Sequence, residues 1–278
     1  MNEQSGKEHK LHHDDLHDYE DVAENYDRYV LAIPGGDDTS VVDFHLDLAR
    51  QYGSSGILDI ACGTGTTLIP LIQNGFEVTG IDVSAAMLAV LRQKISKLPP
   101  IIKKRSTLLC ADMKDFRLAK QASLAVIPRS GFLHLLTPDE QEQCLRNIYQ
   151  HLLPGGVFSF NTFDPSYALV ANNLKGSNPQ PQLRVEYINI RNNKERIWNV
   201  AEFDPDTQVM AGSWIFDEFN EKGEIIDRRI RPIQMRWSFE PEIRHLLRLC
   251  GFEITVQYSS YKKESRTRGN IIWVAQRV

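Results

Sequence analysis

Cysteine is sparse in this chain and follows no spacing that would give it a structural task. The 278 residues include four cysteines, and no two of them form a Cys-x-x-Cys pair. Zinc sites and disulfide frameworks both draw on cysteines at short, regular intervals. We therefore expect no metal site and a reducing, cytoplasmic location. The cysteines are Cys62, Cys110, Cys144 and Cys250.

A surplus of basic charge and a long apolar run are also missing. The formal net charge is -4 and the pI is about 6.1. Such a chain has no overall attraction to nucleic acid or to an anionic membrane. No apolar run is long enough to cross a bilayer, and no signal-peptide core precedes a cleavage site. We expect a soluble globular protein that binds neither nucleic acid nor a membrane.

The first 18 residues are polar and carry His9, His12, His13 and His17. This composition predicts a flexible arm that precedes the fold. Metal binding by these histidines is the alternative. The surrounding Lys, Asp and Glu residues favour a solvated tail instead, and no second cluster of ligands is evident.

The informative part of the chain is a strand, a glycine turn, a helix and a second strand that ends in an acid. Residues 57–61 form a short apolar run suited to a buried parallel strand. Gly63 and Gly65 allow the amides of the next turn to approach a ligand. These amides open a helix, and a helix N-terminus favours an anion. Asp82 ends the second strand, where a carboxylate can accept both hydroxyls of a ribose.

Two features that would point to other nucleotides are absent from this turn. A dinucleotide fingerprint needs a third glycine, and Leu68 occupies that position. No Gly-Lys-Ser or Gly-Lys-Thr follows the turn, so the phosphate loop of NTPases is missing as well. The sequence therefore disfavours NAD and leaves a nucleoside with a small charged tail.

These motifs resemble those of the class I S-adenosylmethionine-dependent methyltransferases. Residues 59–65 match the family's Asp-x-x-Cys-Gly-Thr-Gly turn, and residues 80–84 match its Gly-Ile-Asp-Val-Ser strand end. The resemblance implies S-adenosyl-L-methionine as the cofactor and S-adenosyl-L-homocysteine as its product. It implies cofactor contacts around the turn and the strand end, at Ala61, Gly63, Gly65, Asp82 and Val83.

Alternating strands and helices over residues 57–161 predict an α/β fold with a parallel, doubly wound sheet. The resemblance implies a mostly parallel, seven-stranded, Rossmann-like sheet with a reversed last strand. Four β-rich runs separated by turns predict an antiparallel β insert over the cofactor mouth. The expected domains are the arm (1–18), a methyltransferase domain (19–175 and 236–278) and the insert or substrate lid (176–235).

Further cofactor contacts are expected at the ends of other elements. The Asp112 carboxylate can accept the adenine amine while the Met113 amide meets a ring nitrogen, although an acid in this position can also simply cap a turn. Met87 is a candidate to cover the adenine, with core packing as the alternative. The family has a Tyr-Asp pair that folds over the methionine end, which implies Tyr26 as a contact and Tyr29 as a weaker one. Packing of their helix onto the sheet is the alternative.

The segment 128–137 follows a strand whose end should lie beneath the reacting centre. It resembles methyltransferases with an Arg-Ser-Phe or Asn-Ser-Phe element before a His-Leu pair, which implies that Arg129 and Ser130 line the cofactor tail. A phenol or alcohol acceptor would need a base such as His134 or Tyr258. A hydrogen-bonded structural role is the alternative for His134.

The β insert should supply specificity for the acceptor. Alternating Trp and Arg residues on an antiparallel sheet also arise simply because one face is buried and the other meets water. The candidate substrate-wall residues are Tyr29, Trp198, Trp214, Arg229, Arg231 and Trp237.

The predicted function is transfer of a methyl group to a nitrogen or oxygen of a small-molecule acceptor by in-line displacement, with a homodimer as a possible assembly. A noncatalytic S-adenosylmethionine-binding regulator is the alternative. A nucleic-acid methyltransferase is disfavoured, because Ile127-Pro-Arg-Ser stands where such enzymes carry Asp/Asn-Pro-Pro-aromatic.

Overall fold

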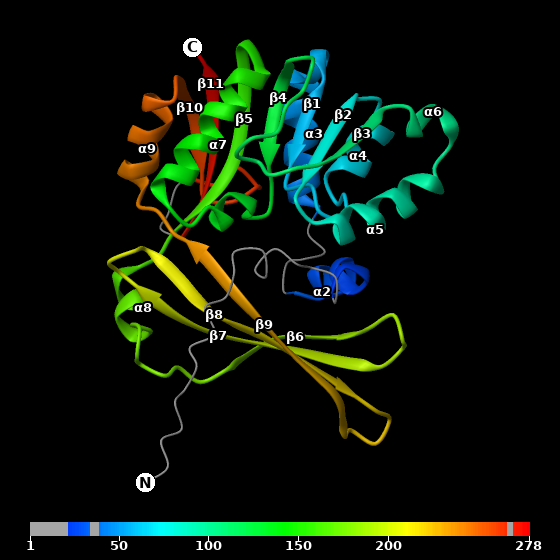
Figure 1. Ribbon diagram of the computed structural model, residues 1–278, viewed down its shortest axis with the longest axis vertical. Helices are drawn as coiled ribbons and strands as arrows, with labels where there is room; N and C mark the ends of the chain where they lie inside the picture. Colours follow the sequence, from blue (N-terminus) through cyan, green and yellow to red (C-terminus); the bar gives the residue numbers. More distant parts are fainter. Residues whose placement is uncertain (1–21, 34–38, 266–268) are drawn as a thin grey trace.

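The structure, a computed structural model, describes residues 22–33, 39–265 and 269–278 (Figure 1). The histidine-rich arm lies outside these residues. The described chain contains two separate sheets, one with seven strands and one with four. None of the helices in the described ranges is long and apolar enough to span a membrane.

The seven-stranded sheet has the order β10-β11-β5-β4-β1-β2-β3. Strands β1 to β5 are parallel to one another. Strand β11 pairs antiparallel with β5, and β10 pairs antiparallel with β11. This confirms the predicted doubly wound sheet with a reversed last strand, and it gathers the carboxyl ends of β1 to β5 at one edge. The strands are β1 (Ile57–Ile60), β2 (Val78–Asp82), β3 (Ser106–Cys110), β4 (Ala122–Ile127), β5 (Leu152–Asp164), β10 (Phe252–Tyr258) and β11 (Gly269–Arg277).

Helices cover both faces of this sheet and enclose two buried clusters. One cluster joins Phe44, Leu71 and Leu88 to one face, and the other joins Leu145 and Ile243 to the opposite face. The helices of the first face are α3 (Ser40–Tyr52), α4 (Leu68–Gln73) and α5 (Ala85–Ser96), with α6 (Pro100–Lys103) at the rim; those of the second are α7 (Pro138–His151) and α9 (Glu240–Leu249).

The ends of α7 illustrate what local sequence dictates. Thr137 and Glu140 form a capping box, in which each side chain accepts a hydrogen bond from the other residue's backbone amide. The helix ends at His151, and β5 begins at the next residue, Leu152. The reason is that Leu152 already pairs with Ala122 of β4.

The second sheet is the predicted antiparallel insert, and its four strands follow one another in space as in sequence. It lies beside the edge where the parallel strands end, and α2 (Tyr26–Ala32) stands between the two sheets (Figure 1). Tyr29, Val185, Ile197 and Phe216 form a buried cluster between α2 and this sheet. The insert consists of β6 (Gln182–Ile188), β7 (Lys194–Asp204), β8 (Val209–Phe219) and β9 (Ile225–Arg236), preceded by α8 (Tyr167–Asn172).

Candidate cofactor and active site

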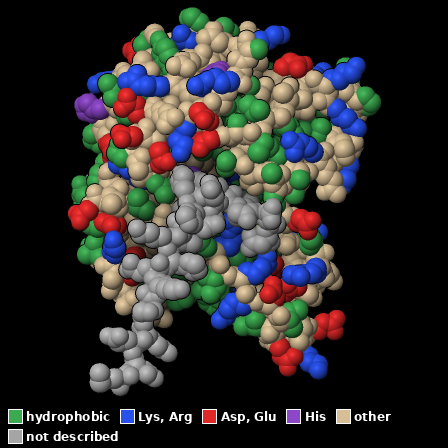
Figure 2. Space-filling model, in the orientation of Figure 1, with side chains coloured by type: hydrophobic (Ala, Val, Ile, Leu, Met, Phe, Trp, Pro, Cys, Tyr) green, Lys and Arg blue, Asp and Glu red, His purple; other side chains and the backbone are tan. Residues whose placement is uncertain are grey.

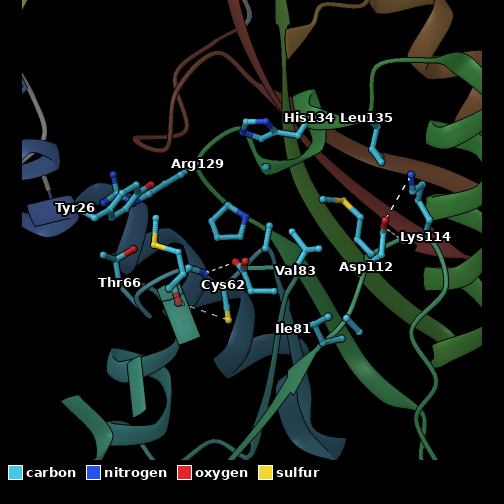
Figure 3. Close-up of a pocket in the computed structure, with 18 residues that line it drawn as sticks. Tyr26, Cys62, Thr66, Ile81, Val83, Asp112, Lys114, Arg129, His134 and Leu135 are labelled. Atoms are coloured by element: carbon cyan, nitrogen blue, oxygen red, sulfur yellow. Dashed lines mark hydrogen bonds and ion pairs between the residues drawn. The ribbon is translucent and has the colours of Figure 1, made fainter. Parts of the chain in front are cut away.

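A cavity opens at the carboxyl ends of the parallel strands and encloses about 990 Å³, its open mouth included. Tyr26 and Arg129 lie at one side of it, and Asp112 and Lys114 lie at the other (Figure 3). This is where ligands collect in open α/β sheets. Ten of the predicted site residues line it: Tyr26, Ala61, Gly63, Asp82, Val83, Met87, Asp112, Met113, Arg129 and His134.

The turn after β1 uses its two glycines differently. Both have positive φ, 54° at Gly63 and 83° at Gly65. A Cβ on Gly63 would meet nothing within 4 Å, so this residue leaves the cavity floor open. A Cβ on Gly65 would lie 2.2 Å from the Leu91 side chain of α5. Gly65 is therefore required for the turn to pack on α5, and it is not among the residues that line the cavity.

Asp82 links this turn to the end of β2. Its Oδ2 accepts the Gly63 amide at 2.7 Å, and its Oδ1 accepts the Ser84 amide at 2.8 Å. Burial raises the pKa of Asp82, although these amides act in the opposite direction. A carboxylate can accept about four hydrogen bonds, so Asp82 keeps capacity for a ligand hydroxyl.

At the far side of the cavity, Asp112 is held by Lys114. The Lys114 amide donates to Asp112 Oδ1 at 2.8 Å, and Lys114 Nζ lies 3.5 Å from Asp112 Oδ2 and 2.8 Å from Glu140 Oε1. Burial lowers the pKa of Lys114, but the two acids outweigh it and raise the pKa overall. The sequence analysis missed Lys114, although its place two residues after Asp112 was the available signal.

A second contact missed from sequence fastens α2 to the glycine turn. Thr64 Oγ1 donates to Asp27 Oδ1 at 2.5 Å, and Lys94 Nζ is paired with Asp27 Oδ2. Lys94 Nζ also donates to the Thr64 carbonyl at 2.9 Å. These three residues form a latch that holds Tyr26 over the cavity, and burial raises the pKa of the Tyr26 hydroxyl.

After β4 the chain turns sharply into a 3-10 helix, η3 (Gly131–His134), which presents His134 to the cavity (Figure 3). Arg129 also lines the cavity, and its buried Nε has no hydrogen-bond partner among the described residues. Ser130 points elsewhere: its hydroxyl accepts Asn161 Nδ2 at 2.9 Å, and it is absent from the lining residues. The lining residues that sequence reasoning missed are Cys62, Thr66, Ile81, Ala111, Lys114, Pro128, Gly131 and Leu135.

The structure does not bring the remaining predicted residues into this cavity. Tyr258 packs edge-on against Phe44, with ring centroids 6.1 Å apart. The Trp198 indole donates to Asp217 Oδ2 at 3.1 Å, and Trp237 is buried beside Phe203.

The other substrate-wall candidates lie on the inner side of the insert. Tyr29 and Trp214 pack together, with ring centroids 5.9 Å apart. Arg231 pairs in register with Trp214, and Arg229 is bound to the buried Glu195. Their proposed roles toward an acceptor stay predictions.

Residues 57–156 match the family model described as a methyltransferase domain. An N,N-dimethyltransferase of dTDP-3-amino-3,4,6-trideoxy-alpha-D-glucopyranose from Streptomyces venezuelae is 32% identical over 139 residues, which are 49% of this chain and 55% of that protein. The match thus spans about half of that relative's length.

Solved structures extend the likeness in fold. The CcbJ methyltransferase of Streptomyces caelestis superposes with a TM-score of 0.75 at 19% identity, covering 95% of this chain and 97% of that one. CalS10, an amino pentose methyltransferase of Micromonospora echinaspora solved with S-adenosylmethionine bound, gives 0.62 at 20% identity over 87% and 91% of the two chains. Residues 57–156 are therefore similar to a methyltransferase domain, in agreement with the predicted family, and the predicted Rossmann-like fold is confirmed.

The contrast between the two glycines can be tested by substitution. We expect Gly65→Ala to lower the free energy of unfolding by about 2–4 kcal/mol, since it adds overlap with Leu91 to the strain of a left-handed alanine. Gly63→Ala is the matched control, because only the backbone strain of about 1 kcal/mol applies there. Urea denaturation measures both, and equal losses would contradict the assigned roles.

Asp59 of β1 makes stability depend on pH. The side chain is fully buried, neither carboxyl oxygen has a hydrogen-bond partner among the described residues, and burial followed by the nearby Asp82 raises its pKa to about 8. An unfolded aspartate titrates near pH 4. The raised folded pKa means that the stability from Asp59 is complete below about pH 4 and is lost as the pH rises toward about 8.

We expect Asp59→Asn to remove this dependence. The variant should gain unfolding free energy relative to the native chain as pH rises, by up to about 1.4 kcal/mol per pH unit between those limits. Urea denaturation at several pH values measures the difference. A difference that stays constant with pH would show that Asp59 does not titrate in this way.

Proposed function

We propose that this protein is an S-adenosylmethionine-dependent methyltransferase that methylates a nitrogen of a small-molecule amine. The observation that carries the proposal is the grouping of Asp82, Asp112 and Arg129 around one cavity, with the open backbone of Gly63 between the strand ends. Two hydrogen-bond acceptors and one cation match the hydroxyls, the amine and the carboxylate of this cofactor.

Each part of the cofactor has a candidate partner in the cavity. The free lone pairs of Asp82 fit the ribose hydroxyls, and Asp112 fits the exocyclic amine of adenine. Val83, Met87 and Met113 supply apolar surface beside the base. Arg129 fits the carboxylate, because its buried Nε still lacks a hydrogen-bond acceptor among the described residues. Tyr26 would cover this end of the ligand.

The bound cofactor supplies a sulfonium methyl, which the acceptor's lone pair takes in line while the carbon–sulfur electron pair returns to sulfur. The chain then has two tasks. It must hold the acceptor atom close to the methyl along that line, and it must keep water out. The latch of Asp27, Thr64 and Lys94 serves the second task by keeping α2 over the cavity.

A neutral amine can attack without prior loss of a proton, so a base takes that proton as the carbon–nitrogen bond forms. His134 lines the cavity from η3, beside which β9 of the insert runs. In this proposal His134 accepts the proton that the methylated nitrogen releases. Nitrogen is favoured over oxygen because both the 32% identical relative and CalS10 are named as methyltransferases of amino sugars.

The proposal includes a cytoplasmic location, no nucleic-acid partner and a homodimer. The cysteines of the described chain are all free thiols, which suits a reducing cytoplasm. Acidic and basic side chains are interspersed on the face in Figure 2, which suits a small acceptor better than nucleic acid.

For a homodimer, the outer face of the insert offers an apolar row across four strands: Leu183, Trp198, Ile215 and Ile230.

Binding measurements test the cofactor proposal directly. We expect calorimetry to detect binding of S-adenosylmethionine and of S-adenosylhomocysteine, but no binding of NAD. Asp82→Ala should weaken both ligands about 100-fold, because it removes two hydrogen bonds to a charged acceptor. Asp115→Ala, which removes an exposed carboxylate near the cavity, is the control and should change affinity little. Binding of NAD alone would contradict the proposal.

The role of His134 is tested by turnover with an identified acceptor. We expect His134→Ala to lower kcat about 100-fold while the affinity for S-adenosylhomocysteine changes by less than about threefold. Tyr258→Phe is the matched control, since Tyr258 packs on Phe44 away from the lining residues. An unchanged kcat across the pH range would remove His134 as a proton acceptor.

A further inference from the structure

The turn that carries Arg129 has an unusual backbone. Arg129 and Ser130 follow β4 in succession with φ of 51° and 67°. Side chains with a Cβ disfavour this left-handed region, and two such residues in a row need support from their surroundings. At the next position, a Cβ on Gly131 would lie 2.8 Å from Ala61, so the turn also packs against the glycine turn of the cofactor cavity.

Asn161 of β5 supplies this support with every polar atom of its side chain. The side chain is only 3% exposed. Its Oδ1 accepts the Ser130 amide at 2.8 Å and the Tyr261 hydroxyl at 3.1 Å. Its Nδ2 donates to Ser130 Oγ and to Asn270 Oδ1, both at 2.9 Å. Four hydrogen bonds exhaust the capacity of an asparagine amide, so its orientation is fixed.

Tyr261 extends this support to the other residue of the turn. Its hydroxyl donates to Asn161 and accepts the Arg129 amide at 3.4 Å. Burial raises the pKa of Tyr261 to about 12, so the hydroxyl keeps the proton that it donates. The ring is held between Phe44 and His45 of α3, at centroid distances of 5.5 and 5.6 Å.

We propose that Asn161 is a positioning residue, which holds the Arg129–Ser130 turn left-handed and thereby directs the Arg129 guanidinium into the cavity to bind the carboxylate of the cofactor. The inference rests on the proposed function, because the carboxylate is that of the cofactor's methionine tail. A guanidinium binds a carboxylate well only when its fork is aligned with both oxygens. A turn free to relax toward ordinary φ values would move the Arg129 side chain out of that alignment.

The test compares a ligand that has the carboxylate with one that lacks it. Calorimetry on the full chain measures the affinities for S-adenosylhomocysteine and for adenosine. We expect Asn161→Ala to weaken S-adenosylhomocysteine about tenfold and adenosine by less than about twofold. Arg129→Ala should show the same selectivity, and the double variant should lose no more than Arg129→Ala alone. A merely structural role of Asn161 would not produce this pattern.

The control is Thr162→Val, which removes a buried hydrogen bond at the neighbouring position of β5, where Thr162 Oγ1 accepts the Trp273 indole at 2.8 Å. It should leave the ratio of the two affinities unchanged. If Asn161→Ala does not fold, Tyr261→Phe is measured instead. It should weaken S-adenosylhomocysteine by less than tenfold, and again more than it weakens adenosine. Equal weakening of both ligands, or none, overturns the proposal. Failure of the native chain to bind either ligand would instead refute the proposed function.

Discussion

The carboxylate of Asp82 joins the two chain segments from which the site is built. It accepts one amide from the turn after β1 and another from the start of α5. Burial of this charge is unfavourable, and the two amides offset much of the cost because each would otherwise lie unpaired beside the cavity. The same contact fixes the left-handed Gly63, on which the open floor of the cavity depends. The side chain of Asp82 thus both shapes the turn and lines the cavity.

The turn after β1 contacts α2, and α2 in turn contacts the insert. Thr64 and Lys94 hold Asp27 of α2, which brings Tyr26 over the cavity. On its other side α2 packs through Tyr29 into the aromatic cluster of the insert. The insert therefore reaches the site by two routes, through α2 and through the contact of β9 with η3.

Sequence predicted those parts of the site that are encoded locally. The strand, turn and acid over residues 57–82 indicated Gly63 and Asp82, and the end of a later strand indicated Asp112. Arg129 was implied by the resemblance of its segment to other methyltransferases. Gly65 was also expected at the ligand, but only the packing of Leu91 shows that it faces α5. Other contacts of the site join residues that are distant in sequence. Lys114 is held by Glu140, and the turn that carries Arg129 is supported by Asn161 and Tyr261. In the insert, the register of the strands determines which side chains meet. A shift of one residue would turn Arg229 away from Glu195.

The cofactor cavity and the insert differ in how their charge is used. In the cofactor half, Asp82 and Arg129 still have hydrogen-bonding capacity at the strand ends. In the insert, the buried Glu195 is bound by Arg229 of β9, and the buried Glu218 is bound by Arg191 of the turn between β6 and β7. Charge that is neutralised internally contributes rigidity and leaves little for a ligand. In the proposed function, recognition of the acceptor then depends mainly on the shape of the surface where β9 of the insert runs beside η3. Such a surface can change its preference by substitution of a few side chains on β8 and β9, while the hydrogen bonds that hold the cofactor half stay as they are.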